Sequence, residues 1–163
     1  LLRACANPLL RDTAFRLVLI GQGPQRAALE SLARELGVAG KVWFAGPMPQ
    51  AELPRWYRAA DVFVLPSHSE GVPNVLLEAS ACGTPWVASR VGGIPEIAHL
   101  GVSRLVPPDS PPELAAAIAG VLAVRPAARP AGPKPREEAV AELIDWLAAT
   151  LARRPPPSGD DRR

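Results

Sequence analysis

Histidine and cysteine are scarce in this chain, and their scarcity limits the chemistry open to it. Cys5 and Cys82 lie far apart in the sequence, and His68 and His99 are isolated from each other. A zinc or iron site needs three or four ligands that converge on one point, often at short fixed spacings. We therefore expect two reduced, mostly buried thiols, no metal site and no metal cofactor.

The sequence also lacks a strong charge imbalance and a long apolar run. Its formal net charge is +2, and its four Trp, one Tyr and three Phe do not alternate with Lys or Arg. We expect no nucleic-acid partner, because such a surface combines a basic field with aromatic rings. The longest apolar run, residues 114–124, is well short of the roughly 20 residues of a membrane span. Because no signal-peptide pattern is seen either, we expect a cytoplasmic protein without a membrane span.

Short apolar strands alternate with helical segments along residues 1–124. Runs rich in β-forming residues predict strands at 15–20, 42–44, 62–65, 86–88 and 104–106. Apolar periodicity predicts helices at 25–36, 52–59, 73–82, 94–99 and 112–124. This alternation is typical of parallel strands covered by helices on both faces. We predict one α/β domain over residues 1–124, with a single Rossmann-like, doubly wound parallel sheet.

The remaining 39 residues have a different composition. Residues 125–135 are rich in proline and predict a linker without regular structure. Residues 136–153 carry an apolar stripe at helical spacing and predict an amphipathic C-terminal helix. Residues 154–163 contain Pro, Ser, Asp and Arg, which predicts a disordered tail.

The stretch SHSEGVPNVLLE, residues 67–78, carries the chemistry. It begins where the predicted strand 62–65 ends, and α/β sheets bind ligands at the carboxyl ends of their strands. Gly71 lets the backbone turn closely past a ligand, and Pro73 suits the first helical position because its missing N–H would be unpaired there. The first turn then presents the free N–H groups of Asn74 and Val75, which favours a diphosphate.

Two glutamates flank this helix start. Glu78 lies one turn beyond Asn74 on the same face, where a carboxylate could accept two hydrogen bonds from a ribose diol. Glu70 lies on the loop side, toward a sugar beyond the phosphates. The pair alone is weak evidence, because glutamates on helix surfaces are usually solvated. The loop placement, Gly71, Pro73 and the following Gly-Thr-Pro at 83–85 strengthen the interpretation of a nucleoside diphosphate sugar site.

Other features have competing interpretations. Gly92 and Gly93 either let the backbone approach a donor or form a simple turn, and Glu96 more readily braces that turn than touches the sugar. His68 could reach a hydroxyl beside Glu70, although an exposed loop histidine is the simpler interpretation. The tryptophans in the predicted elements are expected in the core, namely Trp43, Trp56 and Trp86.

The combination of these segments resembles the group 1 retaining glycosyltransferases. The resemblance covers roughly residues 1–124. The combination of segments is specific for the family, although no single segment is. The similar segments are VLIGQGP at 18–24, VWFAG at 42–46, ADVFVLPS at 60–67, EGVPNVLLEASACGTPWVAS at 70–89 and GGIPE at 92–96.

The resemblance implies a role for each residue of the central motif. Glu70, with Gly71, would contact hydroxyls of the transferred sugar, and Glu78 would bind the ribose. The backbone that holds the diphosphate would be that of Val72, Pro73, Asn74 and Val75.

The resemblance also implies the fold and the reaction. The loop of Gly46, Pro47 and Met48 would lie beside the base of the nucleotide. Members of the family have two Rossmann-like domains with the active site between them, and this chain matches the C-terminal, donor-binding half. The donor would be a UDP-, GDP- or ADP-sugar, transferred with retention to an acceptor hydroxyl that the sequence does not identify, without a metal.

The chain departs from the family at its beginning. It opens in mid-pattern at Leu1 rather than at Met, and the family's Arg and Lys that neutralise the leaving diphosphate have no match. Arg3 and Arg11 stand too close to the first strand to replace them. Fixed positive charge would stabilise the departing group. We therefore expect a chain that is incomplete without a separate N-terminal domain, and we identify no catalytic residue in it.

Three alternatives stay open. A non-catalytic nucleotide-sugar-binding fragment would bind donor without turnover, and a sugar-nucleotide epimerase of the same fold would convert donor without an acceptor. A nicotinamide-binding domain is the weakest alternative. Gly21-Gln22-Gly23 begins a dinucleotide fingerprint, but Arg26 occupies the place of its third glycine.

Overall fold

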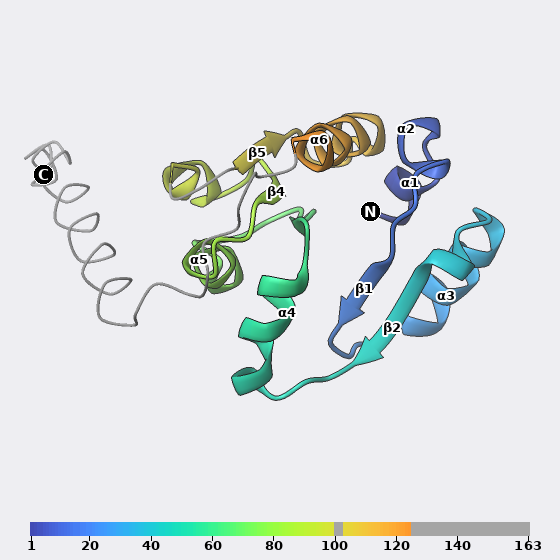
Figure 1. Cartoon of the computed structure of the whole chain (residues 1–163), viewed down its shortest axis with the longest axis horizontal. Coiled ribbons are helices and arrows are strands. Elements are labelled where there is room, and N and C mark those ends of the chain that lie inside the picture. Colours follow the sequence, from blue (N-terminus) through green and yellow to red (C-terminus); the bar gives the residue numbers. More distant parts are fainter. Residues whose placement is uncertain (100–102, 125–163) are drawn as a thin grey trace, which may run out of the picture. The chain divides into compact units, whose positions relative to one another are not determined.

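A computed structural model describes residues 1–99 and 103–124 of the chain, all of which lie in one compact unit, Leu1–Ala131 (Figure 1). The predicted linker, amphipathic helix and tail at 125–135, 136–153 and 154–163 lie outside the described residues. Every described residue thus falls within the stretch predicted to form the α/β domain.

All strands of the described part pair in parallel, as predicted for an α/β fold. They are β1 (Leu17–Ile20), β2 (Val42–Gly46), β3 (Phe63–Leu65), β4 (Trp86–Ser89) and β5 (Ser103–Val106). β1 pairs with β2 from Leu17 opposite Val42, whereas β4 lies between β3 and β5 with Trp86 opposite both Phe63 and Ser103.

The hydrogen-bonded ladder is divided in two, which the sequence pattern did not predict. β1–β2 and β3–β4–β5 are separate sheets, and within residues 1–99 and 103–124 no strand pairs with both β1 and β3. Alternation of strands and helices predicts direction and layering, but it contains no information on which edges are paired.

The helices follow the predicted pattern from residue 25 onward, with ends that shift by one or two residues. They are α3 (Arg26–Glu35), α4 (Leu53–Ala59), α5 (Asn74–Ala81) and α6 (Pro111–Ala123), with 3₁₀ turns η1 (Ala39–Lys41), η2 (Gln50–Glu52) and η3 (Ile94–Ile97).

Two further helices precede β1 and were not predicted. α1 (Leu2–Cys5) and α2 (Pro8–Arg11) have four residues each, too few for a helical periodicity to show in the sequence. The sequence did contain a local signal for α2. Asn7 caps it, because the Leu9 N–H donates to Asn7 Oδ1 at 3.0 Å, and proline follows at the first helical position.

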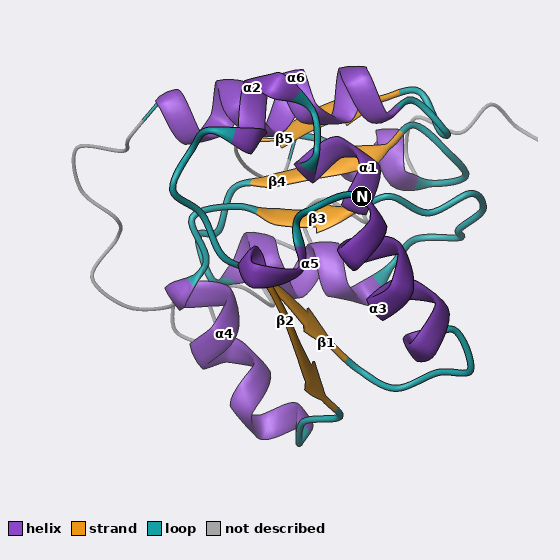
Figure 2. Cartoon of the chain, turned by 90° about the vertical axis from the view of Figure 1, so that its right-hand side faces the viewer, coloured by secondary structure: helices purple, strands orange, loops and turns teal. Residues whose placement is uncertain are grey.

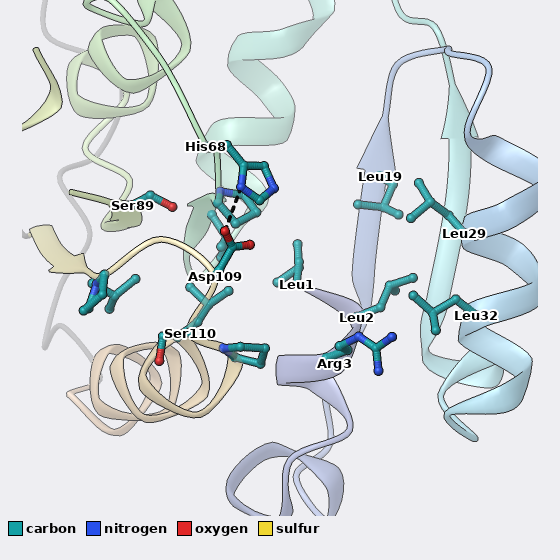
Figure 3. Close-up of a pocket in the computed structure, with 16 residues that line it drawn as sticks. Leu1, Leu2, Arg3, Leu19, Leu29, Leu32, His68, Ser89, Asp109 and Ser110 are labelled. Atoms are coloured by element: carbon teal, nitrogen blue, oxygen red, sulfur yellow. Dashed lines mark hydrogen bonds and ion pairs between the residues drawn. The ribbon is translucent and has the colours of Figure 1, made fainter. Parts of the chain in front are cut away.

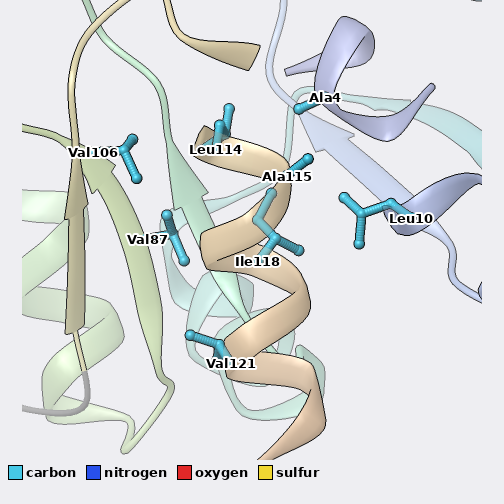
Figure 4. Close-up of a cluster of buried hydrophobic side chains, with 8 residues drawn as sticks. All are labelled: Ala4, Leu10, Val87, Val106, Leu114, Ala115, Ile118 and Val121. Carbon is cyan, nitrogen blue, oxygen red and sulfur yellow. The ribbon is translucent and has the colours of Figure 1, made fainter. Parts of the chain in front are cut away.

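Strand β4 shows how helices cover both faces of its sheet, because successive side chains of a strand point to opposite faces. Val87 joins the core cluster beneath α6, together with Val106, Leu114 and Ile118 (Figure 4). Its neighbour Trp86 faces α5, where its Nε1 donates to Ser80 Oγ at 2.9 Å. Figure 2 shows the elements coloured by type, with α5 and α6 on either side of β3–β4–β5. All four residues of β4 are consequently buried.

The prediction that three tryptophans lie in the core was wrong for one of them. Trp86 is fully buried, but Trp43 is 46% exposed. Trp43 lies on β2, and β1 is the only partner of that strand among residues 1–99 and 103–124. There it packs against the half-buried Trp56, with ring centroids 5.5 Å apart.

Helix α6 contains one glycine whose replacement should stabilise the domain. Gly120 is exposed in the helix, and a Cβ built on it would meet nothing within 4 Å. Glycine in a helix costs roughly 0.5–1 kcal/mol relative to alanine, so Gly120→Ala is expected to raise the free energy of unfolding by about that amount. Urea denaturation measures the change, and a loss of stability would contradict the open environment of this residue.

Candidate functional site: the strand-end loops

The predicted base loop begins at the end of β2. Gly46 is the last residue of that strand, with a φ of +78°, and Pro47 and Met48 follow it. The Gly21 N–H donates to the Gly46 carbonyl at 2.8 Å, which joins the loop after β1 to the loop after β2. The Gly-Gln-Gly turn therefore supports the predicted base loop.

The loop after β3 holds Glu70, the residue predicted to contact the sugar, in place. Ser67 Oγ donates to Glu70 Oε1 at 2.7 Å, and both side chains are half-buried. The hydroxyl fixes one carboxylate oxygen of Glu70 three residues away in the same loop. Glu70 is thus an oriented acceptor rather than a freely moving surface glutamate.

A second loop, after β4, packs directly on this one. The Gly93 N–H donates to the Gly71 carbonyl at 3.0 Å. A Cβ on Gly92 would lie 1.7 Å from the Glu70 carbonyl oxygen, and one on Gly93 would lie 2.7 Å from the Val72 side chain. The two glycines therefore permit a close approach of one backbone to another. The two glycines were interpreted as allowing the backbone to approach a donor. In this structure they allow it to approach residues 70–72 of the neighbouring loop.

Helix α5 begins one residue later than predicted. Pro73 is its N-cap, with a ψ of 121°, and Asn74 is its first helical residue. The Leu76 N–H donates to the Pro73 carbonyl at 3.1 Å. No acceptor among the described residues takes the N–H of Asn74 or Val75. These are the two groups predicted to hold a diphosphate.

Glu78, the residue predicted to bind the ribose, is held by a residue of a different helix. Tyr57, on α4, donates through its hydroxyl to Glu78 Oε2 at 2.9 Å. Tyr57 is only 7% exposed. Burial, and after it the hydrogen bond and charge of Glu78, raise the pKa of the Tyr57 phenol well above its ordinary value. Tyr57 was not predicted as a site residue from the sequence. The only feature that sets it apart there is that it is the single tyrosine of the chain.

Both cysteines are free thiols, as predicted. Cys5 is buried and Cys82 half-buried. Burial raises the pKa of the Cys82 thiol, with a further rise from the charge of Glu78 and an opposing effect of Arg58. Burial also raises the pKa of Cys5. A raised pKa keeps a thiol protonated and unreactive.

A cavity lies elsewhere, between the two sheets. Its volume is about 600 Å³, and its lining includes Leu19 of β1 and Val64 of β3 (Figure 3). His68 and Asp109 lie at this cavity, with His68 Nδ1 3.1 Å from Asp109 Oδ2 and each side chain 75% exposed. His68 is thus an exposed loop histidine. Apart from His68, the lining contains none of the residues predicted to contact the donor, so the strand-end loops remain the candidate site.

The described residues contain no group of three His, Cys, Asp or Glu side chains arranged to hold a metal ion. In the same part of the chain, no helix combines the length and apolar character needed to cross a membrane.

The geometry defines a class of protein. Parallel strands covered by helices, with loops gathered at the carboxyl ends of the strands, are features of a Rossmann-like α/β domain. The family described as "Glycosyl transferases group 1" matches residues 1–123. The chain belongs to this family.

Individual proteins agree with this assignment. The chain is 43% identical over 132 residues to D-inositol 3-phosphate glycosyltransferase 2 of Catenulispora acidiphila, an alignment that covers 75% of this chain and 31% of that protein. Sucrose-phosphate synthase of Thermosynechococcus elongatus superposes with a TM-score of 0.68 at 34% identity, covering 93% of this chain and 41% of that one.

A third comparison concerns the fold. The C-terminal domain of the group 1 protein LpcC from Francisella tularensis has the same fold, with a TM-score of 0.60 at 21% identity. The superposition covers 94% of this chain and 78% of that domain. The chain thus shares the Rossmann-like fold of that C-terminal domain. It spans about a third of the curated relative's length.

Proposed function

We propose that this chain is the donor-binding domain of a retaining glycosyltransferase and binds a nucleoside diphosphate sugar. The observation that carries the proposal is the arrangement around the start of α5. The N–H groups of Asn74 and Val75 have no acceptor among the described residues, and hydrogen bonds orient Glu70 before the helix and Glu78 within it. A helix start of this kind favours anions, and each carboxylate is an acceptor for sugar hydroxyls.

In this proposal each segment contacts one part of the donor. The diphosphate lies at residues 72–75, the transferred sugar at Glu70 and Gly71, and the ribose at Glu78. The base lies beside residues 46–48. The intact reaction moves the sugar to an acceptor hydroxyl, requires no metal and depends on a second domain to close the site. Without that domain the acceptor is not positioned and the donor stays in water.

A binding screen tests the proposal. We expect the chain to bind at least one of UDP-, GDP- and ADP-glucose in isothermal titration calorimetry, and Glu78→Ala to weaken that binding by about 1–3 kcal/mol, the scale of hydrogen bonds to a charged group. Glu35→Ala is the matched control, because Glu35 is an exposed glutamate on α3. Equal affinities of wild type and Glu78→Ala would overturn the ribose assignment. Chelation of metals with EDTA is expected to leave the affinity unchanged.

A second candidate is a nucleotide-sugar-binding module without turnover of its own. The observation in its favour is that the residues assigned to the site at the start of α5 are donor-binding residues, and none of them is identified as catalytic. A transfer assay with the tightest donor distinguishes the two, since sugar transfer by this chain alone would contradict the binding-module candidate. Conversion of donor without any acceptor would instead indicate an epimerase.

A further inference from the structure

We propose that Tyr57 is a positioning residue for ribose recognition: it fixes the Glu78 carboxylate through Oε2 so that Oε1 is left for the ribose diol. The inference rests on the proposed donor-binding function and deepens it. It adds to Glu78 a second residue on which the preference for ribonucleotides over deoxyribonucleotides would depend.

The hydrogen bond uses one oxygen of the carboxylate. The Tyr57 hydroxyl donates to Glu78 Oε2 at 2.9 Å, and no donor among the described residues reaches Glu78 Oε1. Glu78 itself is half-buried, so part of its side chain stays accessible. An ionised carboxylate has about four acceptor positions, so a single phenol donor leaves capacity for hydroxyls of a ligand.

Tyr57 is itself held from two sides. Thr84, which is 5% exposed, donates through Oγ1 to the Tyr57 carbonyl at 2.6 Å. The Phe63 ring meets the Tyr57 ring edge to face, with centroids 5.3 Å apart and planes at 79°. Thr84 lies between α5 and β4, and Phe63 begins β3. The ring of Tyr57 is therefore held against β3, and its backbone is held by the loop that follows the helix carrying Glu78.

This anchoring matters because glutamate is a flexible side chain. A glutamate that is already oriented loses less rotamer freedom when it binds a ligand than a freely moving one. Burial also keeps the Tyr57 phenol protonated, because the pKa of its hydroxyl is raised above the ordinary value. The phenol thus stays a donor at neutral and moderately alkaline pH.

The test compares ribose with deoxyribose. The full chain is titrated with UDP, GDP and ADP, and then with the 2′-deoxy and 3′-deoxy forms of the tightest of them. We expect wild type to prefer the ribonucleotide by about tenfold or more, the scale of one hydrogen bond to a charged group. Tyr57→Phe should reduce this preference to within about threefold by weakening the ribonucleotide, while the deoxy forms keep their affinity.

Two variants separate positioning from a purely structural role. Phe63→Leu removes the ring contact but keeps the phenol and the Thr84 hydrogen bond, and it is expected to lower the ribose preference by less than Tyr57→Phe does. Glu78→Ala is expected to lose the preference. Were Tyr57→Phe unfolded in a thermal melt, Thr84→Val would take its place, since it loosens Tyr57 without removing the hydroxyl and should lower the preference in part.

The outcomes are distinct. A preference that Glu78→Ala loses and Tyr57→Phe keeps would overturn the positioning role while supporting the proposed function. An equal loss in Tyr57→Phe and Phe63→Leu would show that Tyr57 acts only through packing. Wild-type chain that binds none of the three nucleotides would overturn the proposed function and this inference together.

Discussion

Replacement of Gly92 with alanine is expected to destabilise the domain by about 3 kcal/mol or more, through two separate effects. The residue has a φ of +52°, a conformation that costs an alanine roughly 1–2 kcal/mol. The new Cβ would also lie 1.7 Å from the Glu70 carbonyl oxygen. That oxygen is part of the backbone, so a change of rotamer cannot relieve the overlap, and one loop must move.

A second glycine distinguishes these effects. Gly37 has a φ of +70°, but a Cβ on it would meet nothing within 4 Å. Gly37→Ala should therefore show the conformational cost alone, on the order of 1 kcal/mol. Urea denaturation midpoints of the two variants give the difference. Equal destabilisation would mean that the loop after β4 does not rest on Glu70.

Gly92→Ala should also impair donor binding under conditions where the variant is folded. Gly93 donates to the Gly71 carbonyl, so displacement of this turn also displaces the backbone next to Glu70. We expect a loss of affinity for the nucleotide sugar that exceeds the loss for the free nucleoside diphosphate, because Glu70 is proposed to contact the sugar. Calorimetric titration with both ligands measures this difference, and Gly37→Ala should show no such effect.

Trp86→Ala is expected to have the second large effect, a loss of about 3–5 kcal/mol in the free energy of unfolding. Trp86 is fully buried at the start of the central strand β4, and its Nε1 donates to Ser80 Oγ on α5. Truncation creates a large cavity between the sheet and the helix that carries Glu78. It also removes the hydrogen bond that joins them.

Trp43→Ala is the matched control for this loss. It removes the same number of atoms from a side chain that is 46% exposed on an edge strand. We expect a loss of about 1 kcal/mol or less, mostly from its contact with Trp56. Comparable losses in the two tryptophan variants, measured by urea denaturation, would refute the assignment of Trp86 to the core and Trp43 to the surface.

The sequence predicted the parallel α/β pattern because that pattern is a local property. Each strand from Val42 onward contains a short apolar run with a glycine or proline within three residues of its end. The helices after Gly23 carry apolar residues at helical spacing. The helices before β1 were missed because four residues span little more than one turn. The exposure of Trp43 was missed because the identity of the edge strand depends on pairing between distant segments.

The candidate site was predictable only in its local part. Glu70, the helix start at Asn74 and Glu78 follow one another in the chain, so their spacing could be interpreted directly. Tyr57 is 21 residues before Glu78, and Gly92 is 22 residues after Glu70. No sequence periodicity connects residues at such distances, so the hydroxyl that holds Glu78 and the turn that supports Glu70 could be found only in the structure.

The division of the strands into two sheets has a consequence for how a donor would act on the domain. The proposed base contacts follow β2, whereas the phosphate, sugar and ribose contacts follow β3 and belong to the other ladder. A ligand that contacts both sheets would be lost when either sheet unfolds. Bound ligand would therefore couple the unfolding of the two sheets. At a free concentration one hundred times its dissociation constant, such a ligand would raise the free energy of unfolding by about 2.7 kcal/mol.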